Sequence, residues 1–282
     1  DMRQPFQELS PFGLRAAASN VSGTERQPMA MSCRGAQCSP SRLPVRQFVE
    51  QFRNAFSFAD CYEACRSDVL KWTSAHFGHG VCTGVYAAVR TGLKPLYGCE
   101  ILPVAKHVFQ HLTNRRCLGD AFDVDYSCTP NVDVAIFTFD CKDYCSAAKT
   151  IPGEFGETGW MFVHGIPDIL RHMLVLPKAV VVETTGNALR VHNGSAPRQL
   201  IASLRDIGYV VYHNLVQVKY WDPTARERFI LVALHNDLSA AESFDWPQPT
   251  FSSDYFPSIA DVIVPDDEIP SDWWHYTDPG AH

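Results

Sequence analysis

The sequence predicts an α/β fold built on a doubly wound, mostly parallel sheet. Short runs rich in Val, Ile, Phe and Tyr alternate with stretches whose apolar residues recur at helical spacing. The apolar runs are nearly continuous, as in strands that are buried on both faces of a parallel sheet. At 282 residues and 46% hydrophobic content, the chain can bury one sizeable core of this kind. Ligands of such sheets bind at the carboxyl ends of the strands.

The alternation of patterns assigns the elements of this sheet in order. Five segments are predicted to be buried strands: 96–100, 134–139, 179–183, 209–215 and 229–234. Three segments are predicted to be helices: 85–91, 162–174 and 198–207. The last helix has apolar side chains on one face, and Gly208 marks its end.

Composition divides the chain into four regions. Residues 1–43 mix Ser, Pro, Gly, Arg and Gln without a hydrophobic period, which predicts a disordered leader. Residues 44–74 show apolar residues at helical spacing and are expected to form a helical cover. Residues 75–236 hold the alternating elements of the main domain. Residues 237–282 are acidic and rich in Pro and Trp, which predicts an extended tail.

Charge and cysteine usage narrow the function classes. A net charge of -7 disfavours a broad phosphate-binding face, so nucleic-acid contacts are expected to be local or to lie outside this chain. Ten cysteines are irregularly spaced without a signal peptide, which favours a reducing, intracellular compartment over a disulfide framework. Their spacing matches no paired metal motif, so no metal is expected. The apolar runs are too short to cross a membrane.

Two acidic residues on the amino-terminal half of the sheet are candidates for binding a cofactor, one at the end of a predicted strand and one after a turn. A glycine-containing turn, Gly78 to Gly80, precedes a predicted helix, although ordinary strand-to-helix turns share this composition. Glu100 ends a predicted strand, where a carboxylate can hold the ribose hydroxyls of a nucleoside cofactor. Asp120 follows another turn and is expected to meet the adenine amino group.

A thiol, a carboxylate and two guanidinium groups follow or precede other predicted strands. The segment 133–140 runs into Cys141, although a free cysteine taken alone is more often a small buried hydrophobe than a nucleophile. Glu183 ends another strand, and Arg226 and Arg228 lead into a further one. Because strand ends meet at one edge of a parallel sheet, these groups favour a catalytic site.

Taken in chain order, these residues resemble the motifs of the DNA cytosine-5 methyltransferases. The resemblance covers about residues 75–236. Segments that match in order and type are Gly92 to Glu100, Gly119-Asp120, the strand with Cys141, Gly159 to Phe162, Pro177 to Glu183, Ile207 to Tyr209 and Pro223 to Arg228. The resemblance implies a Rossmann-like, S-adenosylmethionine-dependent methyltransferase fold. It also implies that the chain ends before the family's target-recognition region, with residues 237–282 as its beginning.

The resemblance implies a covalent mechanism on cytosine that has left its stack in DNA. The Cys141 thiolate would add to carbon 6 and make carbon 5 nucleophilic. Glu183 would hold or protonate nitrogen 3, and Arg228, helped by Arg226, would bind the exocyclic oxygen. The positions that would bind S-adenosylmethionine are Phe77, Gly80, Thr83, Glu100, Ile101 and Asp120.

Several positions depart from the family pattern near the expected chemistry. Asp140 replaces the proline before the nucleophile, and Lys142 replaces the glutamine after it. The carboxylate disfavours a Cys141 thiolate and the ammonium favours one, so the sequence leaves the net effect open. Thr184 and Thr224 replace an asparagine and a glutamine of the family.

The cofactor turn differs from the family as well. His79, Cys82 and Thr83 stand where glycines are common, and their side chains are expected to crowd the cofactor's methionine moiety.

Three functions therefore remain open. The first is an active DNA cytosine-5 methyltransferase, the second a degenerate homologue that binds or acts as a scaffold, and the third a methyltransferase acting on cytosine in RNA. The compartment is expected to be intracellular, and nuclear if the source is eukaryotic. The oligomeric state is left unassigned.

Overall fold

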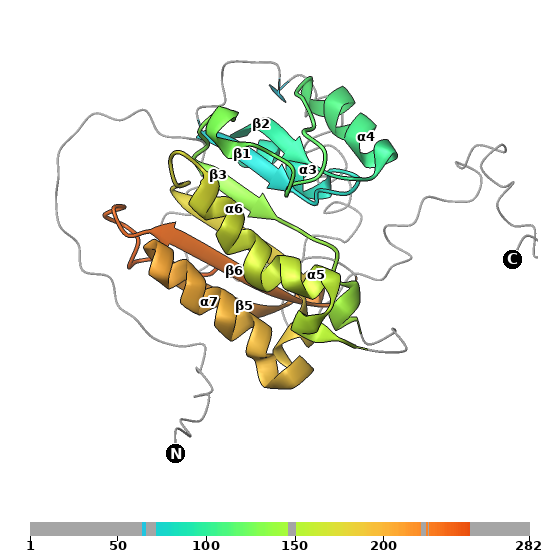
Figure 1. Cartoon of the computed structure of the whole chain (residues 1–282). Coiled ribbons are helices and arrows are strands. Elements are labelled where there is room, and N and C mark those ends of the chain that lie inside the picture. Colours follow the sequence, from blue (N-terminus) through green and yellow to red (C-terminus); the bar gives the residue numbers. More distant parts are fainter. Residues whose placement is uncertain (1–63, 66–71, 146–150, 221–223, 225, 249–282) are drawn as a thin grey trace, which may run out of the picture. The chain divides into compact units, whose positions relative to one another are not determined.

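The structure of the chain is a computed structural model that describes residues 64–65, 72–145, 151–220, 224 and 226–248. These residues contain a six-stranded sheet in the order β2-β1-β3-β4-β6-β5 (Figure 1). The strands are β1 (Trp72–Phe77), β2 (Leu93–Cys99), β3 (Val134–Phe137), β4 (Ala179–Thr185), β5 (Tyr209–Gln217) and β6 (Glu227–His235).

The sheet is mostly parallel, as the sequence predicts. β1 pairs in parallel with β2 and β3, and β3 pairs in parallel with β4. β6 runs antiparallel to both of its neighbours, β4 and β5. The chain moves outward from β1 to β2 on one side and then returns to β3 on the other side. This reversal of direction opens a crevice at the carboxyl ends of β1 and β3, where ligands of doubly wound sheets bind.

Helices connect the strands and bury their apolar faces against the sheet. The α-helices are α3 (Thr83–Arg90), α4 (Pro103–Thr113), α5 (Glu157–Trp160), α6 (Ile166–His172) and α7 (Ser195–Ile207). Figure 1 shows α5, α6 and α7 together on one face of the sheet. Short 3-10 turns lie at Tyr126–Cys128, Lys142–Tyr144, Gly153–Phe155, Gly186–Leu189, Val191–Gly194 and Val218–Tyr220, and a π turn lies at Met161–Gly165.

The larger hydrophobic cluster lies between the sheet and helices α6 and α7. Alternate residues of β4, Val180 and Val182, point into it together with Phe137 of β3. Leu200 and Leu204, one helical turn apart on α7, close it from above. Each fully buried side chain of this kind contributes roughly 1.5–3 kcal/mol of transfer free energy. This cluster holds the central strands in register and so fixes their carboxyl ends.

A second cluster involves α3 and α4, and it includes Cys65 from the segment before β1. Its members are Cys65, Cys82, Val85, Val89, Phe109, Leu112 and Cys117. Ala64 and Cys65 are helical, within the segment expected to cover the sheet. The rest of that expected cover, residues 44–63 and 66–71, lies outside the described residues. Trp72 to Ser74 belong to strand β1, so the helical prediction is wrong for these three residues.

One strand and two α-helices were not among the predicted elements, and one predicted helix differs in form. Strand β1 and helices α4 and α5 are absent from the predicted elements. The helix predicted over 162–174 is instead a π turn followed by α6. Pro167 explains the wider turn, because it has no N–H to bond the carbonyl four residues earlier.

The expected terminal regions fall largely outside the described part of the chain. The predicted leader, residues 1–43, lies outside it entirely, as do residues 249–282 of the predicted tail. Residues 237–242 form turns after β6, and residues 243–248 have no regular secondary structure. None of the described helices is long and apolar enough to cross a membrane.

Candidate active site

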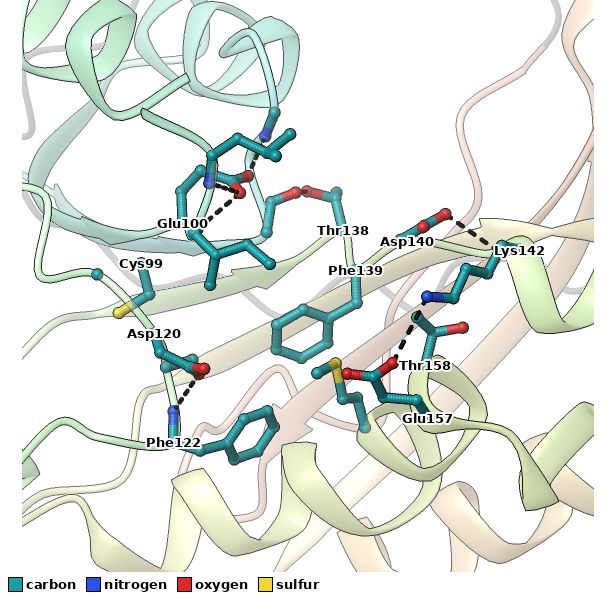
Figure 2. Close-up of a pocket in the computed structure, with 17 residues that line it drawn as sticks. Cys99, Glu100, Asp120, Phe122, Thr138, Phe139, Asp140, Lys142, Glu157 and Thr158 are labelled. Atoms are coloured by element: carbon teal, nitrogen blue, oxygen red, sulfur yellow. Dashed lines mark hydrogen bonds and ion pairs between the residues drawn. The ribbon is translucent and has the colours of Figure 1, made fainter. Parts of the chain in front are cut away.

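A pocket of about 400 Å³ lies at the carboxyl ends of β1, β2 and β3 (Figure 2). It occupies the crevice that the sheet topology opens. The lining residues come from the ends of these strands and the turns after them, from the segment after α4, and from α5 and the π turn that follows it. They are Gly78, Gly80, Cys99 to Leu102, Gly119 to Phe122, Thr138 to Asp140, Lys142, Glu157, Thr158 and Met161.

Gly78 shapes the turn that forms the floor of the pocket. Its φ of +64° lies in the left-handed region, and a Cβ there would collide with Phe139. The Gly78 amide donates to the Cys99 carbonyl at 2.9 Å, which ties the turn after β1 to the end of β2. Only glycine allows both the positive φ and this close approach to Phe139.

Glu100 is held at the end of β2 by backbone amides. One oxygen, Oε2, accepts a hydrogen bond from the Gly80 amide at 2.9 Å. The other, Oε1, accepts from the amides of Ile101 at 2.8 Å and Leu102 at 3.0 Å. The residue is only 8% exposed, yet it lines the pocket. Because a carboxylate offers about four acceptor positions, one remains for a ribose hydroxyl.

The same end of the pocket provides an acceptor and an apolar surface for a purine. Asp120 lines the pocket, and its Oδ1 accepts from the Phe122 amide at 3.0 Å, which fixes the turn. Ile101 lies beside Glu100 with 62% of its surface exposed. An exposed apolar side chain next to two fixed carboxylates fits an adenosine, which has an apolar base face, an amino group and two ribose hydroxyls. The residues present therefore fit a nucleoside cofactor.

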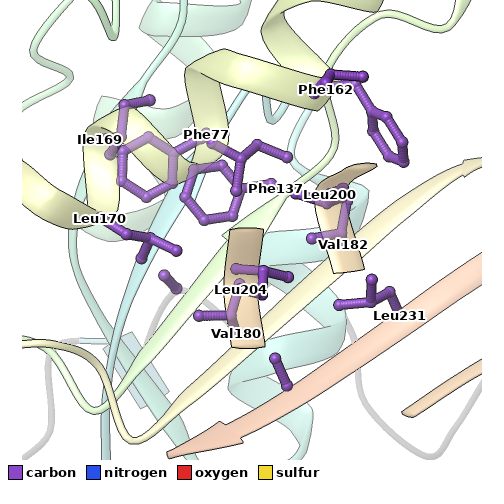
Figure 3. Close-up of a cluster of buried hydrophobic side chains, with 14 of the residues drawn as sticks. Phe77, Phe137, Phe162, Ile169, Leu170, Val180, Val182, Leu200, Leu204 and Leu231 are labelled. Carbon is purple, nitrogen blue, oxygen red and sulfur yellow. The ribbon is translucent and has the colours of Figure 1, made fainter. Parts of the chain in front are cut away.

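Two residues predicted to bind the cofactor lie elsewhere. Phe77 is fully buried in the larger cluster, where its ring stacks on that of Phe137 with centroids 4.4 Å apart (Figure 3). It supports the pocket floor from behind and does not line the pocket. Thr83 is the exposed first residue of α3 and is not a lining residue either. Gly80, Glu100, Ile101 and Asp120 do line the pocket, as predicted.

Two of the three side chains expected to crowd the cofactor, those of His79 and Cys82, point into the second cluster instead. The His79 ring stacks on Phe109 with centroids 4.7 Å apart, and its Nδ1 lies 3.5 Å from the Cys82 sulfur. Burial lowers the pKa of His79 and keeps the imidazole neutral. Neither side chain lines the pocket, so they leave its volume free.

Cys141 lies beside the pocket, in the turn after β3. Its neighbours in sequence, Asp140 and Lys142, both line the pocket, and Cys141 itself is half-buried. The pKa of the thiol is raised, first by burial and then by the charges of Asp140 and Glu183. The structure thus answers the question left open by the sequence, because the net effect on Cys141 disfavours the thiolate.

Glu183 and Arg228 form an ion pair on the adjoining strands β4 and β6. Arg228 Nε lies 2.6 Å from Glu183 Oε1, and the arginine side chain is 14% exposed. Burial raises the pKa of Glu183, and the positive charge of Arg226 opposes this shift. A carboxyl group with a raised pKa is suited to donate or share a proton with a ring nitrogen.

The four predicted catalytic residues therefore come together. The charge of Glu183 acts on Cys141, and Arg226 and Arg228 both act on Glu183. Cys141 also adjoins the pocket, since its two sequence neighbours form part of the pocket wall.

A buried carboxylate, Asp143, positions the turn that carries the thiol. It is 7% exposed, and its Oδ2 accepts from the Thr158 amide at 2.7 Å, the Thr158 hydroxyl at 2.8 Å and the Gly159 amide at 3.1 Å. Burial acts to raise its pKa, but these hydrogen bonds outweigh burial and hold the pKa below its usual range. Gly156 lies so close that a Cβ would collide with this carboxylate.

A second contact ties the thiol turn to the segment after β4. Asn187 Nδ2 donates to the Tyr144 carbonyl at 2.7 Å, and Tyr144 itself is fully buried. Sequence reasoning missed both Asp143 and Asn187, because their partners are distant in sequence. The available signal was weak: Asn187 follows Glu183 by four residues, and Asp143 follows Cys141 by two.

No group of three or more His, Cys, Asp or Glu side chains is arranged to hold a metal ion within the described ranges of the chain.

Sequence comparison with known proteins identifies a family whose model matches this chain. The family model for C-5 cytosine-specific DNA methylases matches residues 80–277. The chain is 23% identical to the Type II methyltransferase M.HaeII of Haemophilus aegyptius over 184 residues, which are 65% of this chain and 54% of that protein. It is 28% identical to M.MspI of Moraxella sp over 165 residues, which are 57% of this chain and 38% of that protein.

The chain spans about half or less of the length of these relatives. Among solved structures, it is similar to an S. pombe Dnmt2 methyltransferase, with 16% identity and a TM-score of 0.48. That match covers 60% of this chain and 52% of the other.

Proposed function

Since this chain belongs to the C-5 cytosine-specific DNA methylase family, we propose that it transfers a methyl group from S-adenosylmethionine to carbon 5 of cytosine in DNA, through a covalent adduct with Cys141. The position of Cys141 carries this proposal. The thiol adjoins a pocket that fits a nucleoside cofactor, and it also feels the charge of Glu183, which pairs with Arg228. A base held by that pair would lie next to both the nucleophile and the methyl donor.

The pocket residues would hold the cofactor by its adenosine half. Glu100 would accept a ribose hydroxyl at its remaining acceptor position, and Asp120 would accept from the adenine amino group. Ile101 would cover the face of the base. When bound, the cofactor supplies an electrophilic methyl group, which carbon 5 takes up while the sulfonium becomes a neutral thioether.

The remaining chemistry belongs to residues of the chain. The Cys141 thiolate forms a sulfur bond to carbon 6, and the ring's electrons move toward carbon 5. Glu183 stabilises this state by sharing its proton with nitrogen 3, and Arg228 binds the exocyclic oxygen. After methylation, carbon 5 loses its proton to solvent, and the carbon–sulfur bond breaks to return the thiolate.

A second function, a binding module without turnover, has specific support. Asp140 and burial raise the pKa of Cys141, which leaves less thiolate at neutral pH. Asp140 and Thr184 also stand where the resemblance leads us to expect a proline and an asparagine. RNA remains a further candidate substrate, since a thiol and a carboxyl group act equally on cytosine in either polymer.

Transfer of a labelled methyl group separates these functions. The 282-residue chain would be incubated with methyl-tritiated S-adenosylmethionine and either duplex DNA or RNA of the same sequence, followed by nucleoside analysis. We expect labelled 5-methylcytosine in DNA, and none with the Cys141→Ser variant. Label in RNA alone would replace DNA as the substrate. Cofactor binding without any transfer would contradict catalysis and favour the binding module.

A further inference from the structure

The pocket wall carries an excess of negative charge. Glu100, Asp120, Asp140 and Glu157 line the pocket, and among the lining residues that the structure describes Lys142 is the one lysine or arginine. The Lys142 ammonium lies 3.6 Å from Glu157 Oε2, so this cation already has an anionic partner. The wall as a whole therefore favours a ligand that carries positive charge.

The carboxylates lie at two separate ends of the pocket. Figure 2 shows Glu100 and Asp120 on one side, Asp140 and Lys142 on the other, and the Phe139 ring between them. Glu100 and Asp120 fit the adenosine half of a cofactor, as argued above. Asp140 lies at the end that adjoins Cys141, where the methyl group must be delivered.

The Asp140 carboxylate has a backbone partner and no paired cation within the part of the chain that the structure describes. Its Oδ1 accepts from the Lys142 amide at 3.1 Å. The Lys142 side chain turns to Glu157 instead of to Asp140. Burial, and after it the negative charge of Asp140, raises the pKa of Cys141, so Asp140 acts on the thiol. An unpaired carboxylate in this place is available to a cationic group of the ligand.

We propose that Asp140 makes this pocket selective for the cationic methyl donor, S-adenosylmethionine, over its neutral product, S-adenosylhomocysteine. The inference rests on the proposed function, because it takes the same pocket as the cofactor site. The two molecules share the adenosine and the amino acid, and differ only by the methyl group and the positive charge on sulfur. A carboxylate near the sulfur therefore attracts the positive charge of S-adenosylmethionine, whereas the sulfur of S-adenosylhomocysteine carries no charge for it to attract.

Selectivity of this kind would help the product to leave. After transfer, the sulfur loses its charge and with it the attraction of Asp140. Because Asp140 is exposed, solvent screens the interaction, and we expect a moderate effect. A preference of about tenfold for the methyl donor is expected, on the order of 1.4 kcal/mol.

Calorimetric titration of the 282-residue chain with both ligands tests the proposal. Sinefungin, which has an ammonium group in place of the sulfonium, serves as a cationic ligand that cannot transfer a methyl group. The test variant is Asp140→Asn, which keeps an oxygen to accept from the Lys142 amide. Asp120→Asn is the matched control at the adenosine end, and Phe139→Leu tests whether the aromatic ring attracts the cation instead.

We expect the unchanged chain to bind S-adenosylmethionine and sinefungin about tenfold more tightly than S-adenosylhomocysteine. Asp140→Asn should remove most of this preference by weakening the two cationic ligands alone. Asp120→Asn should weaken all three ligands alike, and Phe139→Leu should keep the preference.

Three results would overturn the assignment, and they differ in meaning. Equal affinity of the unchanged chain for the donor and the product would contradict the proposed selectivity without contradicting the proposed function. A preference that survives in Asp140→Asn, or that disappears in Phe139→Leu alone, would show that a group other than Asp140 causes the selectivity. Absence of binding by all three ligands to the folded chain would overturn both the selectivity and the cofactor assignment.

Discussion

The two ends of the pocket are built in different ways. At the adenosine end, backbone amides fix the carboxylates: Glu100 accepts from three amides and Asp120 from one. At the reacting end, Asp140 likewise accepts from one amide, but charged side chains also lie close together there, with Asp140 beside Cys141 and Glu183 paired with Arg228. The first end depends on the path of the backbone, whereas the second depends on which charges are present.

This difference shows which function can survive sequence change. An end fixed by backbone amides tolerates substitutions around it as long as the strands and turns are kept. At an end governed by charge, a single substitution can change the reactivity of the thiol. Asp140, at the position where the family pattern has proline, is such a substitution. Cofactor binding and catalysis can therefore be separated by mutation, and four substitutions test this.

The largest expected effect is a loss of methyl transfer without a loss of cofactor binding. Cys141→Ser should lower methyl transfer at least a thousandfold, on the order seen when a nucleophile is removed. S-adenosylmethionine affinity should stay within about twofold, because Cys141 does not line the pocket. Rates from tritium transfer and affinities from calorimetry check the pair of expectations. A parallel loss of cofactor binding would show that the two ends are not separable.

Loss of the buried carboxylate that positions the thiol turn should cost stability. Asp143→Ala removes the acceptor for two amides and a hydroxyl, and should lower the free energy of unfolding by about 3 kcal/mol. Urea unfolding measures this change, with exposed Asp123→Ala as the matched control. An unfolding midpoint equal to that of the control would contradict the role assigned to Asp143.

A smaller loss is expected at the adenosine end. Glu100→Gln keeps one carbonyl acceptor but loses the charge, and should weaken donor and product equally, by about tenfold. The alkylation rate of Cys141 should not change, since Glu100 is not among the groups that shift its pKa. Calorimetry and mass spectrometry of alkylated peptides give the two readouts. An effect on the donor alone would place Glu100 near the reacting sulfur instead.

The smallest expected effect concerns pH. Burial and Asp140 raise the pKa of Cys141, so its thiolate, and with it the rate of alkylation by iodoacetamide, should rise with pH above the usual range for a thiol. Asp140→Asn removes a negative charge, which should move this profile to lower pH and raise the rate a fewfold at pH 8. Exposed Cys128, followed in the same digests, is the internal control. An unmoved Cys141 profile would mean that burial and Glu183, without Asp140, set the shift in its pKa.

Much of the fold follows from sequence, and the missed elements have physical reasons. The strands that became β3 to β6 are short apolar runs, and all four were predicted. β1 was not, because its Ser74 and His76 interrupt the apolar pattern; both are buried, and they bond each other at 3.0 Å. Helix α4 had a usable signal, since its buried residues Ala105, Phe109 and Leu112 recur at helical spacing.

The candidate site was predictable where the chemistry sits at strand ends. Glu100 directly follows β2, Glu183 lies near the carboxyl end of β4, and Cys141 comes four residues after β3, so their meeting at one edge follows from a parallel sheet. Asp143 could not be predicted, because its partners lie about fifteen residues away in a helix whose position only the tertiary structure sets. The orientation of His79, away from the pocket, likewise depends on space beside Phe109.

The most direct test of the central claim, that Cys141 attacks cytosine between the cofactor pocket and the Glu183–Arg228 pair, is covalent trapping. A duplex with 5-fluorocytosine blocks release, because fluorine at carbon 5 cannot leave as a proton does. With S-adenosylmethionine present, intact-mass measurement should show the chain joined to one methylated strand, and Cys141→Ser should show no adduct. A folded chain that binds both cofactor and duplex yet forms no adduct, or forms one at another cysteine, would contradict the account.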